Sequence, residues 1–482
     1  MVGALTVASA AMGTGDAVGR WSELVAPGRR GPVAVLASGV LLFAVDTYVV
    51  ASLLPSAVAD IGGDRFYAWV STIFLLTAVV SSILVSRLLA VVPTRRAYLL
   101  ALAAFGTGLV VDAVSPSIAL LLVGRAVQGV GGGLLSGMAY ALIRTTLPRP
   151  AWTRASAVIS MMWGVGLLIG PALGGVFAEL GAWRWAFAAM ALATALVAGG
   201  VVRALPAVAA PVPVRRRFPL VSVLLVGGAA VVLSVSGLAQ RVAIAAGGLA
   251  IALVLLGLFV AHERRTEAGV LPRATFRHGS PLRAVYLTAA VLVGASAVET
   301  FVPLFGQRLA DLPPLLAGFL GTVLALGWVL GEVASAGSRR RGTPRLAVTL
   351  GPALVVGGLA LTAVTQAAGA SAVVVGLWAV GLFVAGAGIG VGWPHLAAAA
   401  LDAGEDGSEG DKASAAISTL QTLAIALATS WAGVAIGLGE PDPVAAGRLL
   451  YAALAATSVI AVVTAVGARR GVLAVEVAGR ST

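Results

Sequence analysis

The chain has 482 residues, of which 59% are hydrophobic and 11% are charged, and its mean hydropathy is +1.00. Soluble globular proteins have about 25% charged residues, so these values exclude a soluble protein and predict one polytopic membrane domain. The formal net charge of +12 comes from arginines in short loops, a distribution that argues against a nucleic-acid partner. With no cysteine and three scattered histidines, the sequence predicts neither disulfides nor a metal cluster.

Fourteen apolar runs follow an N-terminal tail, 1–32, which we predict to be cytoplasmic. The tail is not a signal peptide, because its positive charges follow rather than precede an apolar stretch. Runs of this length and uniformity predict membrane-spanning helices rather than barrel strands. The runs are Val33–Pro55, Ala68–Leu89, Ala97–Ala113, Ile118–Leu142, Ala155–Phe177, Trp185–Leu205, Leu220–Ala239, Val242–Ala261, Ala284–Phe305, Leu315–Ala336, Leu346–Ala367, Ser371–Leu396, Ala413–Gly437 and Ala445–Ala468.

The loops indicate an internal duplication. Arg87–Arg96 and Arg339–Arg345 are both short and basic, and each follows the second helix of a block of six. We therefore predict two six-helix bundles, 33–205 and 284–468, with linkers and an extra helix pair between them, 206–283, and a cytoplasmic tail, 469–482. Substrate sites in duplicated bundles usually lie near the midplane between the halves.

The placement of basic residues predicts the orientation in the membrane. If the N-terminus is cytoplasmic, 26 of the 32 lysines and arginines fall on the inner side and five on the outer side. This asymmetry, with an even number of helices, predicts that both termini are cytoplasmic. Because Lys412 is the only lysine, the composition is typical of a GC-rich bacterial genome, and we expect a multi-pass protein of the bacterial inner membrane.

The one remaining basic residue, Arg125, lies within the fourth run, where an unpaired charge is costly. Its depth is about 10 Å from the outer end of the run, and Asp46 lies about 20 Å from the inner end of the first run. In a hydrocarbon core about 30 Å thick these depths coincide. Glu299, about 22 Å into the ninth run, has a comparable depth. These three residues are the candidate proton-coupling groups.

Each carboxylate also has a simpler interpretation. Asp46 could be the structural partner of Arg125, or it could carry protons, because burial favours its neutral form and an approaching cation favours the carboxylate. Glu299 could bind a proton or a cationic substrate, or it could line a cavity without a coupling role. Asp112 and Glu332, near the ends of their runs, are predicted to be interfacial.

Small residues in the fourth and fifth runs predict close helix packing. In the fifth run, glycines recur every fourth position and form a smooth stripe, on which a neighbouring helix can pack, while Pro171 kinks or softens the helix. Close packing could be the whole role of this stripe, or it could let the two halves rock. The packing candidates are Gly129, Gly133, Gly166, Gly170, Pro171, Gly174 and Gly175.

Three motifs resemble those of the major facilitator superfamily. RAVQGVG from Arg125 looks like its fourth-helix motif, and GLLIGPALGG from Gly166 is similar to the fifth-helix motif of its exporters. DTYVVASLLP from Asp46 resembles the first-helix motif of its 14-helix drug:proton antiporter branch. The loop Arg87–Arg96 departs from the family pattern, because it has arginines but no acid. The resemblance implies an all-α major facilitator fold of two six-helix bundles with two extra central helices, 14 transmembrane helices in total.

The resemblance implies a proton-coupled antiporter that exports amphipathic small molecules or drugs by alternating access. The open alternatives are an exporter of lipids or lipid conjugates and, less favoured, a membrane sensor or assembly factor. No catalytic constellation or ATPase motif is present, so we expect a transporter rather than an enzyme. We expect it to use a proton gradient as its energy source and to need no cofactor. Its expected partners are protons and membrane lipids, and we expect a monomer. Candidate substrate-cavity residues, each of which could instead be a packing residue, are Tyr48, Gln128, Trp163, Phe301, Phe305 and Trp328.

Overall fold

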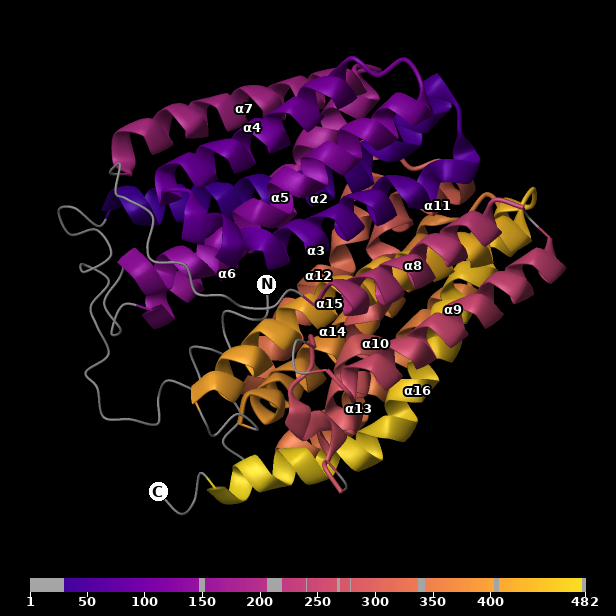
Figure 1. The fold of residues 1–482 in the computed structure, drawn as a ribbon. Coiled ribbons are helices and arrows are strands. Elements are labelled where there is room, and N and C mark those ends of the chain that lie inside the picture. Colours follow the sequence, from indigo (N-terminus) through magenta and orange to yellow (C-terminus); the bar gives the residue numbers. More distant parts are fainter. Residues whose placement is uncertain are drawn as a thin grey trace. The chain divides into compact units, whose positions relative to one another are not determined.

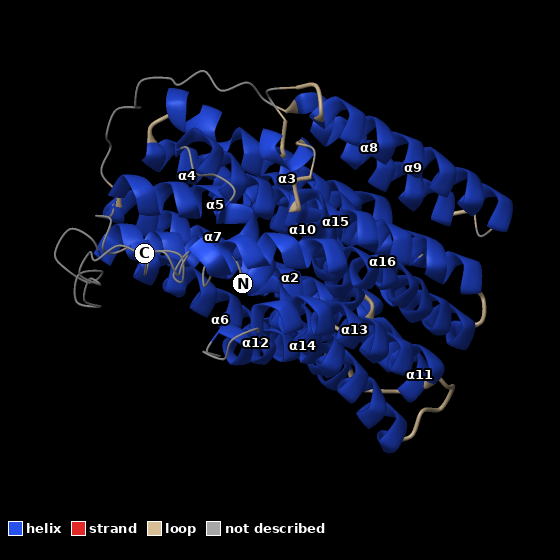
Figure 2. Cartoon of the chain, turned by 90° about the horizontal axis from the view of Figure 1, so that it is seen from below, coloured by secondary structure: helices blue, strands red, loops and turns tan. Residues whose placement is uncertain are grey.

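The computed structural model describes residues 30–146, 152–205, 219–239, 241–266, 269–277, 279–336, 343–402 and 407–478. In these ranges the chain is built from α-helices, with short 3₁₀ segments and no strand (Figures 1 and 2). Fourteen helical stretches are long and apolar enough to cross a membrane. The all-helical architecture and the number of spans predicted from the apolar runs are thereby confirmed.

The first compact unit, unit 1, comprises residues 1–64 and 73–218. Within it α2 packs along α6 and also contacts α5 and α7, and α4 packs between α5 and α7. Proline occurs inside two of these helices, at Pro55 and Pro171. The six helices are α2 (Arg30–Ile61), α3 (Tyr67–Val91), α4 (Thr94–Ala113), α5 (Ile118–Thr146), α6 (Trp152–Glu179) and α7 (Trp183–Ala204).

The second compact unit, unit 2, comprises residues 65–72 and 219–482, so the first turns of α3 cluster with it. Trp69 Nε1 donates to the carbonyl of Ser234 at 3.2 Å, and Tyr67 Oη donates to the carbonyl of Thr300 at 3.3 Å. The longer helices of the unit are α8 (Leu220–Gly237), α9 (Val242–Glu263), α10 (Leu282–Gly294), α12 (Pro314–Ala336), α13 (Thr343–Val364), α14 (Ala372–Asp402), α15 (Gly407–Gly439) and α16 (Pro443–Ala478).

The extra helix pair, α8 and α9, is attached to the rest of unit 2 through α15. Ala229, Leu233, Ala245 and Ala252 form an apolar core with Val434 of α15. At the other end of the pair, the buried carboxylate of Glu263 accepts hydrogen bonds from the Ser222 hydroxyl and from the backbone N–H groups of Val270 and Leu271. This carboxylate therefore joins both helices of the pair to the chain that follows them.

The ninth span is interrupted, although the sequence predicts an uninterrupted run. Helix α10 passes into the 3₁₀ segment η6 (Ala295–Thr300), and α11 (Val302–Ala310) continues beyond it. Proline cannot donate a backbone hydrogen bond and clashes with the carbonyl four residues earlier. Pro303 therefore leaves the Glu299 carbonyl without its α-helical donor, which accounts for a break at this place.

Several predicted boundaries differ from the structure. Helix α16 continues through Ala478, so most of the segment predicted as a C-terminal tail is helical. Helices α14 and α15 are likewise longer at their facing ends than the apolar runs. The predicted N-terminal tail lies outside the described residues except for 30–32, as does most of the linker after α7. The division into two bundles and a central pair stays a prediction.

Candidate functional site

A buried polar cluster joins α2 and α5 in unit 1. Arg125 Nη1 lies 2.9 Å from Oδ2 of Asp46, and Gln128 Nε2 donates to Oδ1 of the same carboxylate at 2.6 Å. Arg125 also donates to the amide oxygen of Gln128. Because Arg125 and Gln128 are three residues apart on α5, they share one face of that helix. All three side chains are at most 2% exposed.

The aromatic ring of Phe74 completes the surroundings of Arg125. The guanidinium carbon lies 4.0 Å from the ring centroid, the geometry of a cation–π contact. The cluster thus pairs one buried positive charge with one buried carboxylate, an amide and an aromatic face. Such an ion pair is disrupted when the carboxylate takes up a proton or when another cation competes for it. The arrangement is therefore suited to binding one proton or one cation at Asp46 in exchange for the contact with Arg125.

Asp112 of α4 is a second buried acid near this cluster, and the prediction that it is interfacial is wrong. Its side chain is fully buried rather than interfacial, and neither carboxylate oxygen has a hydrogen-bond partner among the described residues. A Cβ on Gly124 would lie 2.0 Å from its Oδ1. The glycine directly before Arg125, which leaves room for this carboxylate, was the available signal.

The predicted glycine stripe of α6 lies against α2. A Cβ on Gly170 would lie 2.4 Å from the Cβ of Tyr48, and Cβ atoms on Gly166 and Gly174 would lie 3.0 and 2.5 Å from backbone atoms of α2. Pro171 and Gly175 of the same helix are buried. These contacts lie within unit 1 and bring the two backbones together. A role of the stripe in rocking stays a prediction.

The glycines of α5 make a second close approach, to α3. A Cβ on Gly129 would lie 2.4 Å from the carbonyl oxygen of Phe74, and one on Gly133 would lie 2.0 Å from that of Ala78. Since Phe74 also lies under Arg125, this packing positions the aromatic face of the polar cluster.

Glu299, the third predicted proton-coupling residue, lies in unit 2, in the 3₁₀ segment η6. Its Oε1 atom is buried and has no hydrogen-bond partner among the described residues. A Cβ on Gly321 of α12 would lie 3.3 Å from Pro303 and 3.6 Å from the Glu299 carbonyl oxygen, so α12 passes close to the break. The structure thus brings Asp46 and Arg125 together and places Glu299 in the other unit.

The aromatic substrate candidates occupy different surroundings in the two units. In unit 1, the half-buried Trp163 meets Phe43 edge-on at 5.8 Å between ring centroids. In unit 2, Phe301 packs on Tyr67 at 5.8 Å, the buried Phe305 packs near Gly447, and Trp328 meets Trp393 at 6.4 Å.

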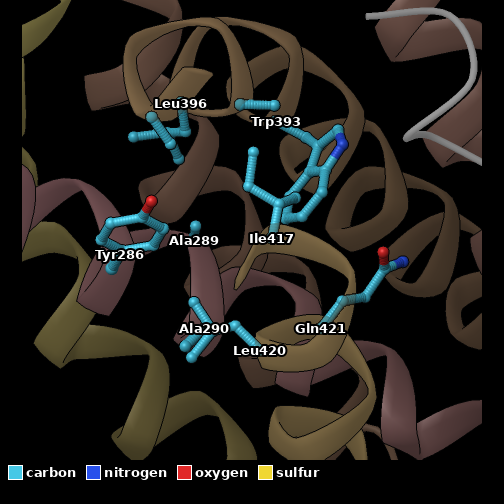
Figure 3. Close-up of a pocket in the computed structure, with 10 residues that line it drawn as sticks. Tyr286, Ala289, Ala290, Trp393, Leu396, Ile417, Leu420 and Gln421 are labelled. Carbon is cyan, nitrogen blue, oxygen red and sulfur yellow. The ribbon is translucent and has the colours of Figure 1, made fainter. Parts of the chain in front are cut away.

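A small, shallow pocket in unit 2 lies between α10, α14 and α15 (Figure 3). It is lined by Tyr286, Trp393, Leu396, Ile417, Leu420, Gln421 and four alanines. None of the six predicted substrate residues is among them. Among the described residues, no group of three or more histidine or acidic side chains is arranged to hold a metal ion.

Comparisons with known proteins agree with this architecture. The model of the Major Facilitator Superfamily matches residues 36–429. A protein of Mycobacterium tuberculosis named a probable multidrug-efflux transporter is 46% identical over 457 residues, which cover 93% of this chain and 97% of that protein. The crystal structure of a peptide transporter, POT, in complex with sulfate has a TM-score of 0.67 at 14% identity and covers 91% of this chain and 94% of its own. A bacterial homologue of the human lysosomal transporter Spinster has a TM-score of 0.62, also at 14% identity, and covers 93% and 97%.

Proposed function

The chain belongs to the Major Facilitator Superfamily, and from this premise we propose that it exports amphipathic small molecules or drugs in exchange for protons. The relative of similar length in Mycobacterium tuberculosis supports efflux as the direction of transport. The observation that carries the proton coupling is the buried contact of Asp46 with Arg125 and Gln128 inside the spanning helices. Ionisable groups inside membrane proteins are costly, and they commonly mark proton or substrate pathways.

In the proposed cycle a proton from outside binds Asp46 and releases Arg125 from it. Arg125 keeps its contacts with Gln128 and Phe74, which offset part of the loss of its counter-charge while the ion pair is open. Return of Arg125 to Asp46 expels the proton toward the cytoplasm. In a bacterial inner membrane, with both termini cytoplasmic, the membrane potential contributes about 2.3 kcal/mol per charge for each 100 mV. Glu299 serves as the second proton or cation site, in unit 2. The transporter acts as a monomer and needs no cofactor.

Proton exchange in everted vesicles tests this proposal. With a pH-sensitive dye inside the vesicles, addition of a transported substrate is expected to raise the internal pH. Asp46→Asn removes the titratable group and is expected to abolish the response. Asp60→Asn is the matched control, because Asp60 is also on α2 but is exposed and paired with Arg184. An unchanged response in Asp46→Asn combined with Glu299→Gln would overturn the assignment of both acids.

A substrate panel in a host lacking its own pumps separates drug export from lipid export. Resistance to amphipathic drugs, with lower drug accumulation in the cells, is the expected result. Accumulation that is unchanged for every drug, together with transfer of a labelled lipid to the outer leaflet, would favour the lipid exporter instead.

A further inference from the structure

Asp112 is a buried acid that has no role in the exchange cycle described above. It is the second-last residue of α4, at the end of that helix predicted to face outside, and its side chain is fully buried. Neither of its carboxylate oxygens has a hydrogen-bond partner among the described residues. A buried carboxylate without a donor or a counter-charge is costly, because it loses its contacts with water. The position therefore suits a carboxyl group that carries a proton.

The close packing of α4 on α5 places Asp112 about one helical turn from the polar cluster. A Cβ on Gly124 would lie 2.0 Å from Asp112 Oδ1, and a Cβ on Gly108 would lie 2.5 Å from the backbone nitrogen of Gln128. The two contacts are successive steps along one antiparallel helix pair, separated by four residues and therefore by about 6 Å of helix rise. At the inner step, Gln128 donates to Oδ1 of Asp46 at 2.6 Å.

The opposite side of Asp112 is close to the protein surface. Val114, two residues further along the chain, is 65% exposed. The backbone carbonyl of Ser115 accepts a hydrogen bond from Arg184 of α7 at 2.9 Å, and Arg184 also pairs with the exposed Asp60. Asp112 is therefore located between the exposed connection from α4 to α5 and the buried polar cluster.

Charged side chains of both signs lie on the helices around Asp112. Helix α5 contributes Arg125 and α7 contributes Arg184, while α2, which contacts both of those helices, contributes Asp46 and Asp60. Each arginine is paired with an acid of α2, Arg125 with Asp46 and Arg184 with Asp60. Asp112 is the acid of this group that accepts no hydrogen bond from either arginine.

We propose that Asp112 relays protons from the outer side of the membrane to Asp46. One O–H bond breaks at Asp112 and one forms at Asp46, no electrons are transferred, and the contact of Asp46 with Arg125 opens. The Asp112 carboxylate then takes up the next proton from the outer side. Chains of acidic residues serve as proton relays in membrane transporters. The relay supplies an entry route for the proton and rests on the proposed function.

Coupled and uncoupled transport of one probe drug, ethidium, test the relay. Coupled exchange is the dye response of everted vesicles to ethidium, and uncoupled exchange is the replacement of labelled by unlabelled ethidium without a pH gradient. Asp112→Asn is expected to slow coupled exchange about tenfold or more, since a positioned acid commonly accelerates proton transfer by larger factors. It is expected to leave uncoupled exchange unchanged, and Asp112→Glu is expected to restore the coupled rate. The control is Asp60→Asn, which removes an exposed acid at the same end of the unit.

Infrared difference spectra of the purified full-length protein test the relay without a transported drug. Wild type at neutral pH is expected to show the C=O band of a protonated carboxyl group that is missing in Asp112→Asn and present in Asp60→Asn. A spectrum that Asp112→Asn leaves unchanged would overturn the relay, whether or not ethidium is transported.

The transport results separate the relay from the proposed function. Normal coupled exchange in Asp112→Asn would overturn the relay and leave the proton-coupled exporter intact. Equal slowing of coupled and uncoupled exchange would also overturn it, because the substitution would then disturb the transporter as a whole. A protonated Asp112 in the spectra of a protein that moves ethidium without protons would support the proton-carrying state of this residue and overturn the coupled exporter.

Discussion

At the scale of single residues, the positive charge of Arg125 is compensated from three directions: by the Asp46 carboxylate, by the Gln128 amide and by the ring of Phe74. Removing one partner of a buried ion pair leaves the other charge uncompensated, which is more costly than the pair itself is stabilising. The same physics makes the pair useful for transport, since Arg125, which keeps only Gln128 and Phe74 when a proton or a cation occupies Asp46, is driven to return to the carboxylate.

A double-mutant cycle tests this interdependence. Asp46→Asn is expected to destabilise the protein by about 3–5 kcal/mol, because it leaves the guanidinium without a counter-charge. Adding Arg125→Gln is expected to recover part of that loss, so the two effects are strongly non-additive. Thermal unfolding in detergent measures each variant. The exposed pair Asp60–Arg184 is the control and is expected to show little coupling, because water screens it. Additive losses at Asp46 and Arg125 would contradict a stabilising buried pair.

At the scale of helices, the close spacing between α2 and α6 depends on the glycines Gly166, Gly170 and Gly174 of α6. Tyr48, Val45 and Val49 of α2 occupy the space that side chains on the α6 stripe would need. Helices in lipid gain little from the hydrophobic effect when they associate, so close van der Waals contact contributes more. The glycine stripe therefore holds α6 against α2, and larger side chains do not fit at its positions.

Paired alanine substitutions on α6 test the stripe. Gly170→Ala places a methyl group against Tyr48 and is expected to destabilise the protein by about 1–3 kcal/mol. Gly164→Ala on the same helix has no neighbour within 4 Å of the added carbon. It is expected to be neutral or slightly stabilising, since alanine is the better helix former. The thermal midpoint in detergent and the vesicle dye response are measured for both. Equal midpoints would contradict the close packing, and an intact dye response in a destabilised Gly170→Ala would argue against a role of the stripe in rocking.

At the scale of the whole molecule, the apolar runs predict the fold well because lipid offers the backbone no hydrogen bonds, so every spanning segment must be helical. The shared depth of Asp46 and Arg125 was also accessible, since helix rise converts sequence distance into depth, but their contact was not. The break at Glu299 had a local signal, Pro303, which was overlooked. The burial of Glu332, predicted to be interfacial but only 2% exposed, and the position of Asp112 beside the cluster had none in the hydropathy of their runs. Each depends on which neighbouring helix faces the residue, and hydropathy along one run carries no information about that.

The orientation of the whole molecule is testable because the natural chain contains no cysteine. Val91, which is 70% exposed, is the last residue of α3 and lies at the arginine-rich connection to α4, and the exposed Ser371 directly precedes α14. Arginine-rich loops of membrane proteins stay on the cytoplasmic side, so we expect Val91 to face the cytoplasm and Ser371 to face the outside. A membrane-impermeant maleimide is therefore expected to label Ser371→Cys in intact cells and Val91→Cys only in everted vesicles. The unsubstituted chain is the background control in both preparations. The reverse pattern would contradict the arginine distribution and place both termini outside.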